Sequence, residues 1–413
     1  MKEPNIKFYN GNSWQHHTIG DLCDLLTGYP FPGNQIKEKG TNLLMRGINI
    51  TEGRIRHSDE IDRYYSENTC GLEKYRLQPG DLVISMDGSK VGKNSALVTS
   101  KENNSLLVQR VARLRNNDKN LIELIQIAIS SGKFIKYVEE KKTSSAIPHI
   151  SPADIKNFTL SLPNDINERK KIAFYFTFLD SQISTSKSRL ASLKQVKEAS
   201  LQAMFPQEGE TVPKIRFKGF EGEWEKVKLN SFAKRIMRKN SHLESTLALT
   251  IASAYGLVSQ IDYFNNSVVG ANLRNYYLLK KGEFAYNKSY SNGYPFGSVK
   301  RLDKYEQGIL STLYIVFSIN DSISSDYLTH FFDTSLWHKE VAERAAEGAR
   351  NHGLLNIGAE DFLDINIWKP QKKEEQEKIA SYFTALDHKI SLQAQRLEKL
   401  KQIKAACLDK MFV

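Results

Sequence analysis

Residues 168–205 read ERKKIAFYFTFLDSQISTSKSRLASLKQVKEASLQAMF, and residues 375–412 read EQEKIASYFTALDHKISLQAQRLEKLKQIKAACLDKMF. The two stretches are identical at 21 of 38 positions, at a constant offset of 207 residues and without a gap. Similarity of this length indicates an internal repeat. The chain is therefore expected to consist of two related halves, each of which ends in one copy of this stretch.

Both copies are predicted to form long helices. Neither contains proline or glycine, and residues that favour helices dominate both. Their apolar residues recur at steps of three and four, which is the spacing of a coiled-coil seam, and the polar residues Ser186 and Gln393 interrupt the two seams at matched places. The seam residues are Ile172, Phe176, Leu179, Ile183, Leu190 and Leu193 in the first copy, and Ile379, Phe383, Leu386, Ile390, Leu397 and Leu400 in the second.

A helix of this length, roughly 55 Å at 1.5 Å per residue, needs a partner for its apolar stripe. Because the two seams match, we expect the copies to pack against each other or against a third protein. Two unrelated surface helices are the alternative interpretation.

Composition indicates several domains and an acidic partner. A chain of 413 residues is long enough for two or more domains. The formal net charge of +11 and the pI near 9.2 favour nucleic acid, although a basic protein of another kind has the same balance. The three cysteines, Cys23, Cys70 and Cys407, form no Cys-x-x-Cys pair, which predicts a cytoplasmic protein without disulfides or a zinc site. No segment resembles a signal peptide, and no apolar run reaches the ~18 residues of a membrane span.

The sequence around the long stretches is expected to contain divergent, β-rich domains inside matching frames. Residues 4–14 recur loosely as residues 213–224, with Trp14 and Trp224 as predicted core anchors. The boundary between the halves is predicted at residues 206–223, which are rich in Gly, Pro and charge. Strands are predicted at Leu82–Ser85, Ser105–Leu114, Phe284–Tyr286 and Ser311–Ile319, and helices at Leu121–Ser131 and Tyr327–Glu347. Divergence within a repeated frame indicates one scaffold with two specificities.

No catalytic constellation is recognisable in the sequence. An amino-methyltransferase needs a glycine-rich cofactor loop and an Asn/Asp-Pro-Pro-aromatic motif, and neither is present. Residues 88–94 imitate a phosphate loop, but the spacing is one residue short and the loop ends in Asn94. Residues 140–142 have a nuclease-like Glu-x-Lys spacing in a charged helical context, which favours a solvated surface. The nine histidines lack metal-ligand spacing, so no metal or cofactor site is predicted in this chain.

Two divergent domains, each followed by a nearly identical long helix, resemble the specificity subunit of Type I restriction–modification systems. The residues that carry the resemblance are WEKVKL at 224–229, EQEKIASYFTALDHKI at 375–390 and RLEKLKQIK at 396–404. It covers essentially the whole chain. One small departure is Arg169, which stands where the family usually has the glutamine found here at Gln376.

The resemblance implies an α/β fold with two target recognition domains, separated by two long antiparallel helices in a tandem repeat with pseudo-two-fold symmetry. The expected regions are a first recognition domain at 1–163, a central helical spacer at 164–206, a second recognition domain at 207–370 and a C-terminal helical spacer at 371–413. Domains held roughly 50 Å apart by such helices span about 15 base pairs at 3.4 Å each. The expected target is therefore split into two short parts around an unread spacer.

The resemblance also implies a division of labour. This subunit binds double-stranded DNA without catalysis or a cofactor of its own. Two modification subunits carry S-adenosylmethionine and methylate adenine, and up to two restriction subunits use ATP and Mg. The competing hypotheses are a self-sufficient DNA-modifying or nuclease enzyme and a coiled-coil scaffold.

Two sets of residues are candidates for these contacts. DNA-binding candidates lie in the divergent segments and carry donors suited to base edges or phosphates: Arg46, Arg54, Arg56, Ser89, Lys90 and Lys93 in the first half, and Arg274, Asn287, Lys288, Tyr290, Asn292 and Arg350 in the second. Candidates for the modification-subunit interface match between the copies but lie beside or off the seam, and packing between the two helices is the alternative role. They are Tyr175, Asp180 and Arg189, with Tyr382, Asp387 and Arg396.

Overall fold

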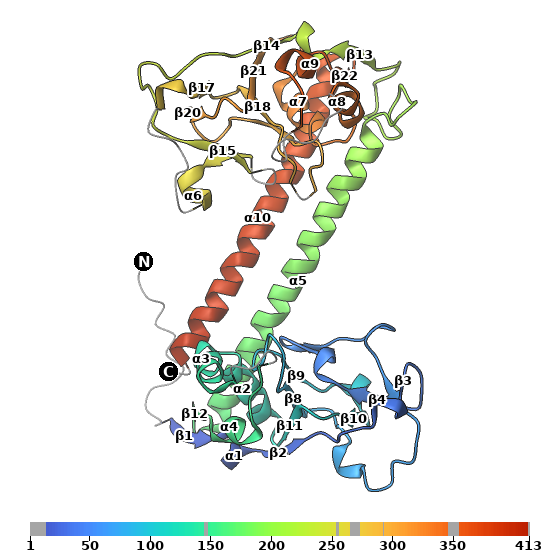
Figure 1. The fold of residues 1–413 in the computed structure, drawn as a ribbon, viewed down its shortest axis with the longest axis vertical. Helices are drawn as coiled ribbons and strands as arrows, with labels where there is room; N and C mark the ends of the chain where they lie inside the picture. Colours follow the sequence, from blue (N-terminus) through green and yellow to red (C-terminus); the bar gives the residue numbers. More distant parts are fainter. Residues whose placement is uncertain are drawn as a thin grey trace. The chain divides into compact units, whose positions relative to one another are not determined.

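The computed structural model describes residues 14–143, 148–252, 256–264, 273–291, 293–345 and 355–411. The chain divides into two compact units (Figure 1). The first unit comprises residues 1–187 and 395–413, and the second comprises residues 188–394. Each long helix therefore belongs partly to each unit.

The first unit is built on an antiparallel four-stranded sheet in the order β2 (Asp24–Thr27), β11 (Val111–Arg115), β8 (Leu82–Ser85) and β9 (Ser95–Leu97). Its other strands are β1 (Gln15–Thr18) paired with β12 (Thr159–Leu162), β5 (Ile50–Thr51) paired with β6 (Arg54–Ile55), and a sheet of β10 (Leu106–Leu107), β4 (Asn42–Met45), β7 (Tyr64–Tyr65) and β3 (Ile36–Lys37). Its helices are α1 (Ile19–Leu22), α2 (Lys119–Ile129), α3 (Gly132–Lys141) and α4 (Pro152–Asn157), with short 3-10 turns η1 (Gly33–Gln35), η2 (Gly47–Asn49), η3 (Glu73–Tyr75) and η4 (Ser100–Glu102).

The second unit repeats this plan. Its antiparallel sheet has the order β14 (Ala233–Arg235), β21 (Ile315–Ile319), β18 (Phe284–Asn287) and β19 (Ser298–Arg301). The remaining strands are β13 (Glu225–Lys228) paired with β22 (Asn366–Lys369), β15 (Leu249–Ala252) with β16 (Gly256–Ser259), and β17 (Tyr277–Lys280) with β20 (Gln307–Leu310). Its helices are α6 (Gln260–Phe264), α7 (Ser325–Phe331), α8 (His338–Arg344) and α9 (Ala359–Leu363), with 3-10 turns η5 (Leu229–Ser231) and η6 (Leu273–Asn275).

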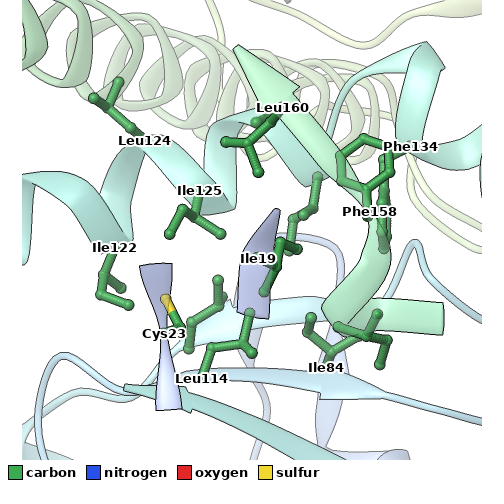
Figure 2. Close-up of a cluster of buried hydrophobic side chains, with 14 of the residues drawn as sticks. Ile19, Cys23, Ile84, Leu114, Ile122, Leu124, Ile125, Phe134, Phe158 and Leu160 are labelled. Carbon is green, nitrogen blue, oxygen red and sulfur yellow. The ribbon is translucent and has the colours of Figure 1, made fainter. Parts of the chain in front are cut away.

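Each unit packs its main core against the long helices and carries a smaller β part farther away. In the first unit α2, α3 and α4 gather beside α5 (Ile166–Met204), whereas β3, β4 and β10 lie outward (Figure 1). Figure 2 shows the centre of this hydrophobic core, where Ile122 and Ile125 of α2 face Ile19 and Leu114. In the second unit α7, α8 and α9 gather in the same way beside α10 (Lys373–Met411). Burial of apolar surface thus fixes each domain onto the helices.

The predicted seams are the buried faces of the two long helices. Ile172 and Phe176 join the first core, Ile379 and Phe383 join the second, and all four are at most 2% exposed. Within each unit the helix segments run antiparallel, because contacting residue numbers rise along one helix as they fall along the other. The contacts are Tyr175–Cys407, Asp180–Lys404 and Gln182–Arg396 in the first unit, and Lys197–Asp387 and Ser200–Tyr382 in the second.

The contacts of one unit repeat those of the other. Asp180 and Lys404 correspond by the repeat to Asp387 and Lys197, and both pairs form ion pairs across the helices. The start of each long helix is also fastened in the same way. Arg169 Nε donates to the carbonyl of Pro163 at 2.6 Å, and Gln376 Nε2 donates to that of Pro370 at 3.0 Å. The departure at Arg169 therefore preserves this helix-start contact.

Two elements differ from the sequence prediction. The strand predicted at Ser105–Leu114 is two strands, β10 and β11, separated by a turn. The helix predicted at Tyr327–Glu347 is α7 and α8, because the chain turns at 332–337 to bury Trp337, which is 1% exposed; residues 346 and 347 lie outside the described residues. Trp224 is a buried core residue, and Trp14 packs on the first core while its Nε1 donates to Glu168. Among the helices described, none has the length and apolarity to span a membrane.

Candidate nucleic-acid interface

Matched hairpin loops lie at the same place in the two central sheets. In the first unit β8 and β9 are joined by residues 86–94, and in the second β18 and β19 are joined by residues 288–297. Both hairpins begin with the same glycine turn, in which Gly80 and Gly282 adopt positive φ values of 97° and 85°. The loops themselves differ in sequence and length, so the divergence falls on a matched, surface-facing element.

The first loop does not have the context of a phosphate loop. Residues 88–94 connect two strands, whereas a phosphate loop leads from a strand into the N-terminus of a helix. Ser89, Lys90 and Lys93 are exposed on this loop. Their side chains are therefore displayed to solvent on a hairpin rather than arranged around a nucleotide.

The structure brings the remaining first-unit candidates beside this loop. Lys90 Nζ lies 3.1 Å from Glu52 Oε1, in the turn between β5 and β6, and Gly53 N donates to the carbonyl of Ser95 at 2.9 Å. The β5–β6 hairpin carries Arg54, and Arg46 and Arg56 flank it. Six residues spread over 48 positions of sequence, 46–93, thus lie on adjoining segments.

The three arginines differ in how many of their N–H donors already form hydrogen bonds within the unit. Arg46 Nη1 donates to the carbonyl of Ile61 at 3.4 Å, and Arg56 Nε donates to that of Ile48 at 2.9 Å. Arg54 is exposed on a two-residue strand. Because a guanidinium has five N–H donors, each of the three retains some for an external acceptor.

The second-unit candidates separate into two places. Asn287 ends β18, and Lys288 and Tyr290 follow in the matched loop, where Tyr290 is 56% exposed. Lys288 Nζ is directed to the carbonyl of Ile357 at 3.3 Å, which ties it to its own unit. Arg274 lies instead on η6, where its Nη1 donates to the carbonyl of Ser241 at 2.6 Å. Asn292 and Arg350 lie outside the described residues.

Sequence reasoning missed two exposed residues in the turns that precede the central strands. Arg110 precedes β11 and is 57% exposed, and Leu313 lies shortly before β21 and is 61% exposed. Both fall inside or beside segments predicted as strands. Two consecutive polar or charged positions, at 109–110 and again at 311–312, are a weak turn signal. Only the observed register places these turns beside the hairpin loops.

Most candidates for the partner interface contact the other long helix. Tyr175 Oη lies 3.8 Å from Cys407 Sγ, and Tyr382 Oη lies 2.9 Å from Ser200 Oγ. Asp180 and Asp387 form the cross-helix ion pairs described above. These four side chains therefore take part in contacts between the helix segments of their unit. Asp180 and Tyr382 are exposed all the same, as are Arg189 and Arg396, and Arg396 donates to Gln182 Oε1 at 3.2 Å.

A buried polar network fastens the second domain to its helix segments. Lys197 Nζ lies 2.9 Å from Asp333 and 2.7 Å from Asp387, and Lys300 Nζ lies 2.8 Å from Asp333. Burial alone raises the pKa of Asp333, but the ammonium groups of Lys300 and Lys197 outweigh it and hold that pKa well below its usual range. Burial lowers the pKa of His330, whose Nε2 lies 3.1 Å from Thr384 Oγ1.

The same network includes metal-ligand residue types. One ligand atom each of His330, Asp333 and Asp387 lies within 4.8 Å of the others. Both carboxylates already bind lysine ammonium groups, which compete with a cation for the same oxygens. The arrangement is therefore that of an ion-pair network between α5, α7, β19 and α10.

Comparison with known proteins identifies two copies of one family domain. The model of the Type I restriction modification DNA specificity domain matches residues 12–195 and again residues 221–402. A search of curated proteins finds no match. Among solved structures, the S subunit of a Type I restriction–modification system from M. genitalium is similar, with 15% identity, a TM-score of 0.62, and coverage of 100% of this chain and 99% of that chain. A chain from a structural study of complex assembly and conformational transition of the type I R-M system has 16% identity, a TM-score of 0.52, and coverage of 96% and 97%.

Proposed function

We propose, from the fact that this chain belongs to the Type I restriction–modification DNA specificity family, that its two units each read one part of a split double-stranded DNA target. Recognition of DNA sequence is the family's role. The two-part target is our inference for this chain.

One observation carries the proposal. The same sheet is present twice, with the same strand order and the same glycine turn, and the loops between its matched strands differ. Selection for one shared target would keep the loops alike, whereas two different half-sites require different loops on one scaffold. Exposed donors on these loops, such as Lys90 and Lys93, suit base edges or phosphates.

The chain is proposed to act without catalysis. Methyl transfer to adenine is assigned to two modification subunits with S-adenosylmethionine, and translocation and cleavage to as many as two restriction subunits with ATP and Mg. The purified full-length chain, supplied with these cofactors and plasmid DNA, should neither methylate nor cut. Methyl incorporation by the chain alone supports the self-sufficient enzyme instead.

The partner surface is proposed to be the outward face of the second half of each long helix. Arg189 and Val196 on α5 correspond by the repeat to Arg396 and Ile403 on α10, and all four are exposed. The repeat preserves an arginine and a β-branched apolar residue two turns apart where the cores do not require them. Two identical partner subunits must meet the same surface twice, which accounts for such a match.

This surface can be tested by co-purification with the modification subunit. Val196→Asp together with Ile403→Asp places a charge on both copies and should reduce the bound modification subunit by at least about tenfold, since burial of a charge in an interface is costly. Leu392→Asp is the matched control, because Leu392 is 51% exposed but corresponds to Thr185 in the other copy. Equal loss in the control, or no loss in the double variant, contradicts this surface.

The proposal of a split target is tested by methylome sequencing of cells that carry the complete system. The expected result is a methylated motif of two short specific parts around unspecified bases. A single continuous motif, or no methylation that depends on this chain, overturns it.

A further inference from the structure

We infer that a second reading element lies beside the hairpin loops, namely the turn before each central strand, and that Arg110 and Leu313 are its specificity-determining residues. This inference rests on the proposed function. It concerns side chains outside the loops 86–94 and 288–297.

The two turns occupy equivalent places before their central strands, although only Arg110, and not Leu313, has a positive φ. Val111 N donates to the carbonyl of Val108 at 3.1 Å, and Tyr314 N donates to that of Ser311 at 3.2 Å. The strands fix the correspondence, because Leu114 pairs with Leu82 in the first sheet and Phe317 pairs with Phe284 in the second. Counting back three residues from each shows that Val111 corresponds to Tyr314, and therefore Arg110 to Leu313. Each occupies the third position of a four-residue turn.

The first turn adjoins the hairpin loop that carries Ser89, Lys90 and Lys93. Met86 N donates to the carbonyl of Arg110 at 2.9 Å, and Arg110 Nη1 lies 3.8 Å from Asp87 Oδ2. A donor placed here can reach the same ligand as the loop. Since 3.8 Å is too long for a hydrogen bond, the carboxylate orients the guanidinium without using its donors.

Arg110 occupies a backbone conformation that favours glycine. Its φ is 66°, and the third position of such a turn is usually glycine or asparagine when φ is positive. A branched or long side chain is disfavoured there because Cβ crowds the following carbonyl. The fold would therefore be better served by glycine, and the arginine side chain, 57% exposed, contributes no hydrogen bond to the described part of the unit. An arginine in a strained turn position, whose described side-chain contact is only the long ion pair with Asp87, indicates a role in binding.

A role in binding is also inferred for Leu313, because its apolar side chain is exposed. Its side chain is 61% exposed at the matched position, where a polar residue would cost the fold nothing. The two turns thus display opposite chemistry: a forked donor in one unit and an aliphatic group in the other. In the major groove an arginine suits the O6 and N7 acceptors of guanine, and an aliphatic side chain suits the methyl group of thymine. This is the difference expected between readers of two half-sites.

The experiment compares methylomes of cells that carry the complete system with the unaltered chain, Arg110→Gly, Arg110→Lys or Leu313→Ala. Arg110→Gly should lower discrimination at one base pair of one half-site by about tenfold and leave the other half-site unchanged. Arg110→Lys should keep methylation but relax the same base pair, because an ammonium lacks the two-pronged geometry. Leu313→Ala should relax one base pair of the other half-site only.

Matched controls distinguish base recognition by Arg110 from the effects of a changed backbone conformation and of a lost charge. Asn104→Gly relieves the same kind of backbone conformation, at φ 64°, and Lys136→Ala removes one exposed charge from α3; neither should alter the motif. The melting temperature of Arg110→Gly should be no lower than that of the unaltered chain. A lower one shows that Arg110 serves the turn, and an unaltered motif shows that it reads nothing; either result overturns the assignment. Absence of a split motif with the unaltered chain would instead refute the proposed function.

Discussion

At the scale of single residues, matched positions of the two units solve the same packing problem with different chemistry. With the helix caps Asp118 and Ser324 aligned, His330 of α7 and Asp333, just after α7, correspond to Leu124 and Ile127 in the first unit. Ile127 packs against the apolar core of the first unit, whereas Asp333 at the matched position pairs with two lysines. At this place the second unit adds ion pairs to the apolar contacts that hold both domains to the helices.

Asp333→Asn should destabilise the second unit strongly. The change leaves Lys300 in a largely buried site without the carboxylate that neutralises it, while Lys197 keeps its pair with Asp387. Breaking a buried pair costs on the order of 3–5 kcal/mol. Asp180→Asn is the control, because its pair with Lys404 is exposed and worth about 0.2–1 kcal/mol. Urea denaturation of both variants measures the difference. Similar small losses of unfolding free energy in both variants would show that the network does not stabilise the second unit.

His330 should contribute to a loss of stability on acidification. Burial keeps its pKa below the unfolded value of about 6.5, even though Asp333 and Asp387 oppose this effect and Lys197 adds to it. Between those two pKa values the unfolded chain binds more protons, so stability falls as pH falls from 7 towards 5. The variant His330→Gln, whose side chain can still form a hydrogen bond with Thr384, should lose less stability when the pH falls. Part of the pH dependence should remain, because burial also lowers the pKa of His338. Thermal melts at pH 7.5 and 5.5 test this, and equal losses in both proteins contradict it.

At the scale of elements, regular periodicity was predictable and interruptions were not. The long helices follow from their uninterrupted seams, and strand Leu82–Ser85 follows from the glycine turn before an apolar run. The break between β10 and β11 is a turn in which Arg110 adopts a positive φ, a conformation that no propensity of arginine indicates. The split between α7 and α8 depends on burial of Trp337, a tertiary contact. For the same reason, the sequence could not show that Asp180, an exposed residue like Arg189, forms an ion pair with Lys404 of the other long helix.

The long helices should set the length of the unread spacer. Both helices contribute to both units, so lengthening one alone would shift its register against the other. Inserting four residues after Ser186 and four after Gln393 adds about 6 Å of rise to each helix, close to two base pairs at 3.4 Å. Four residues turn a helix by about 400°, which leaves the seam only about 40° out of phase. The variant should methylate the same half-sites with a longer spacer.

One-residue insertions at the same two places are the control. They rotate each seam by about 100° and should abolish assembly. An active four-residue variant that keeps the original spacer would show that the helices are not the ruler, and that partner subunits position the domains.

At the scale of the whole molecule, the internal repeat gives the chain two units of the same plan. Each has its own core, sheet and loops, and the resemblance between the units is concentrated in the helices and in the frame around the divergent segments. The proposed function therefore predicts modular specificity. Exchange of a domain should transfer half of a target.

The most direct test exchanges residues 15–145 for the corresponding segment of a relative with a different target, followed by methylome sequencing of cells that carry the complete system. The exchange replaces the first sheet and its loops but retains both long helices and the second domain. We predict that one half of the methylated motif changes to that of the relative, while the other half and the spacer stay the same. A change in both halves together, or in neither, would contradict independent reading by the two units.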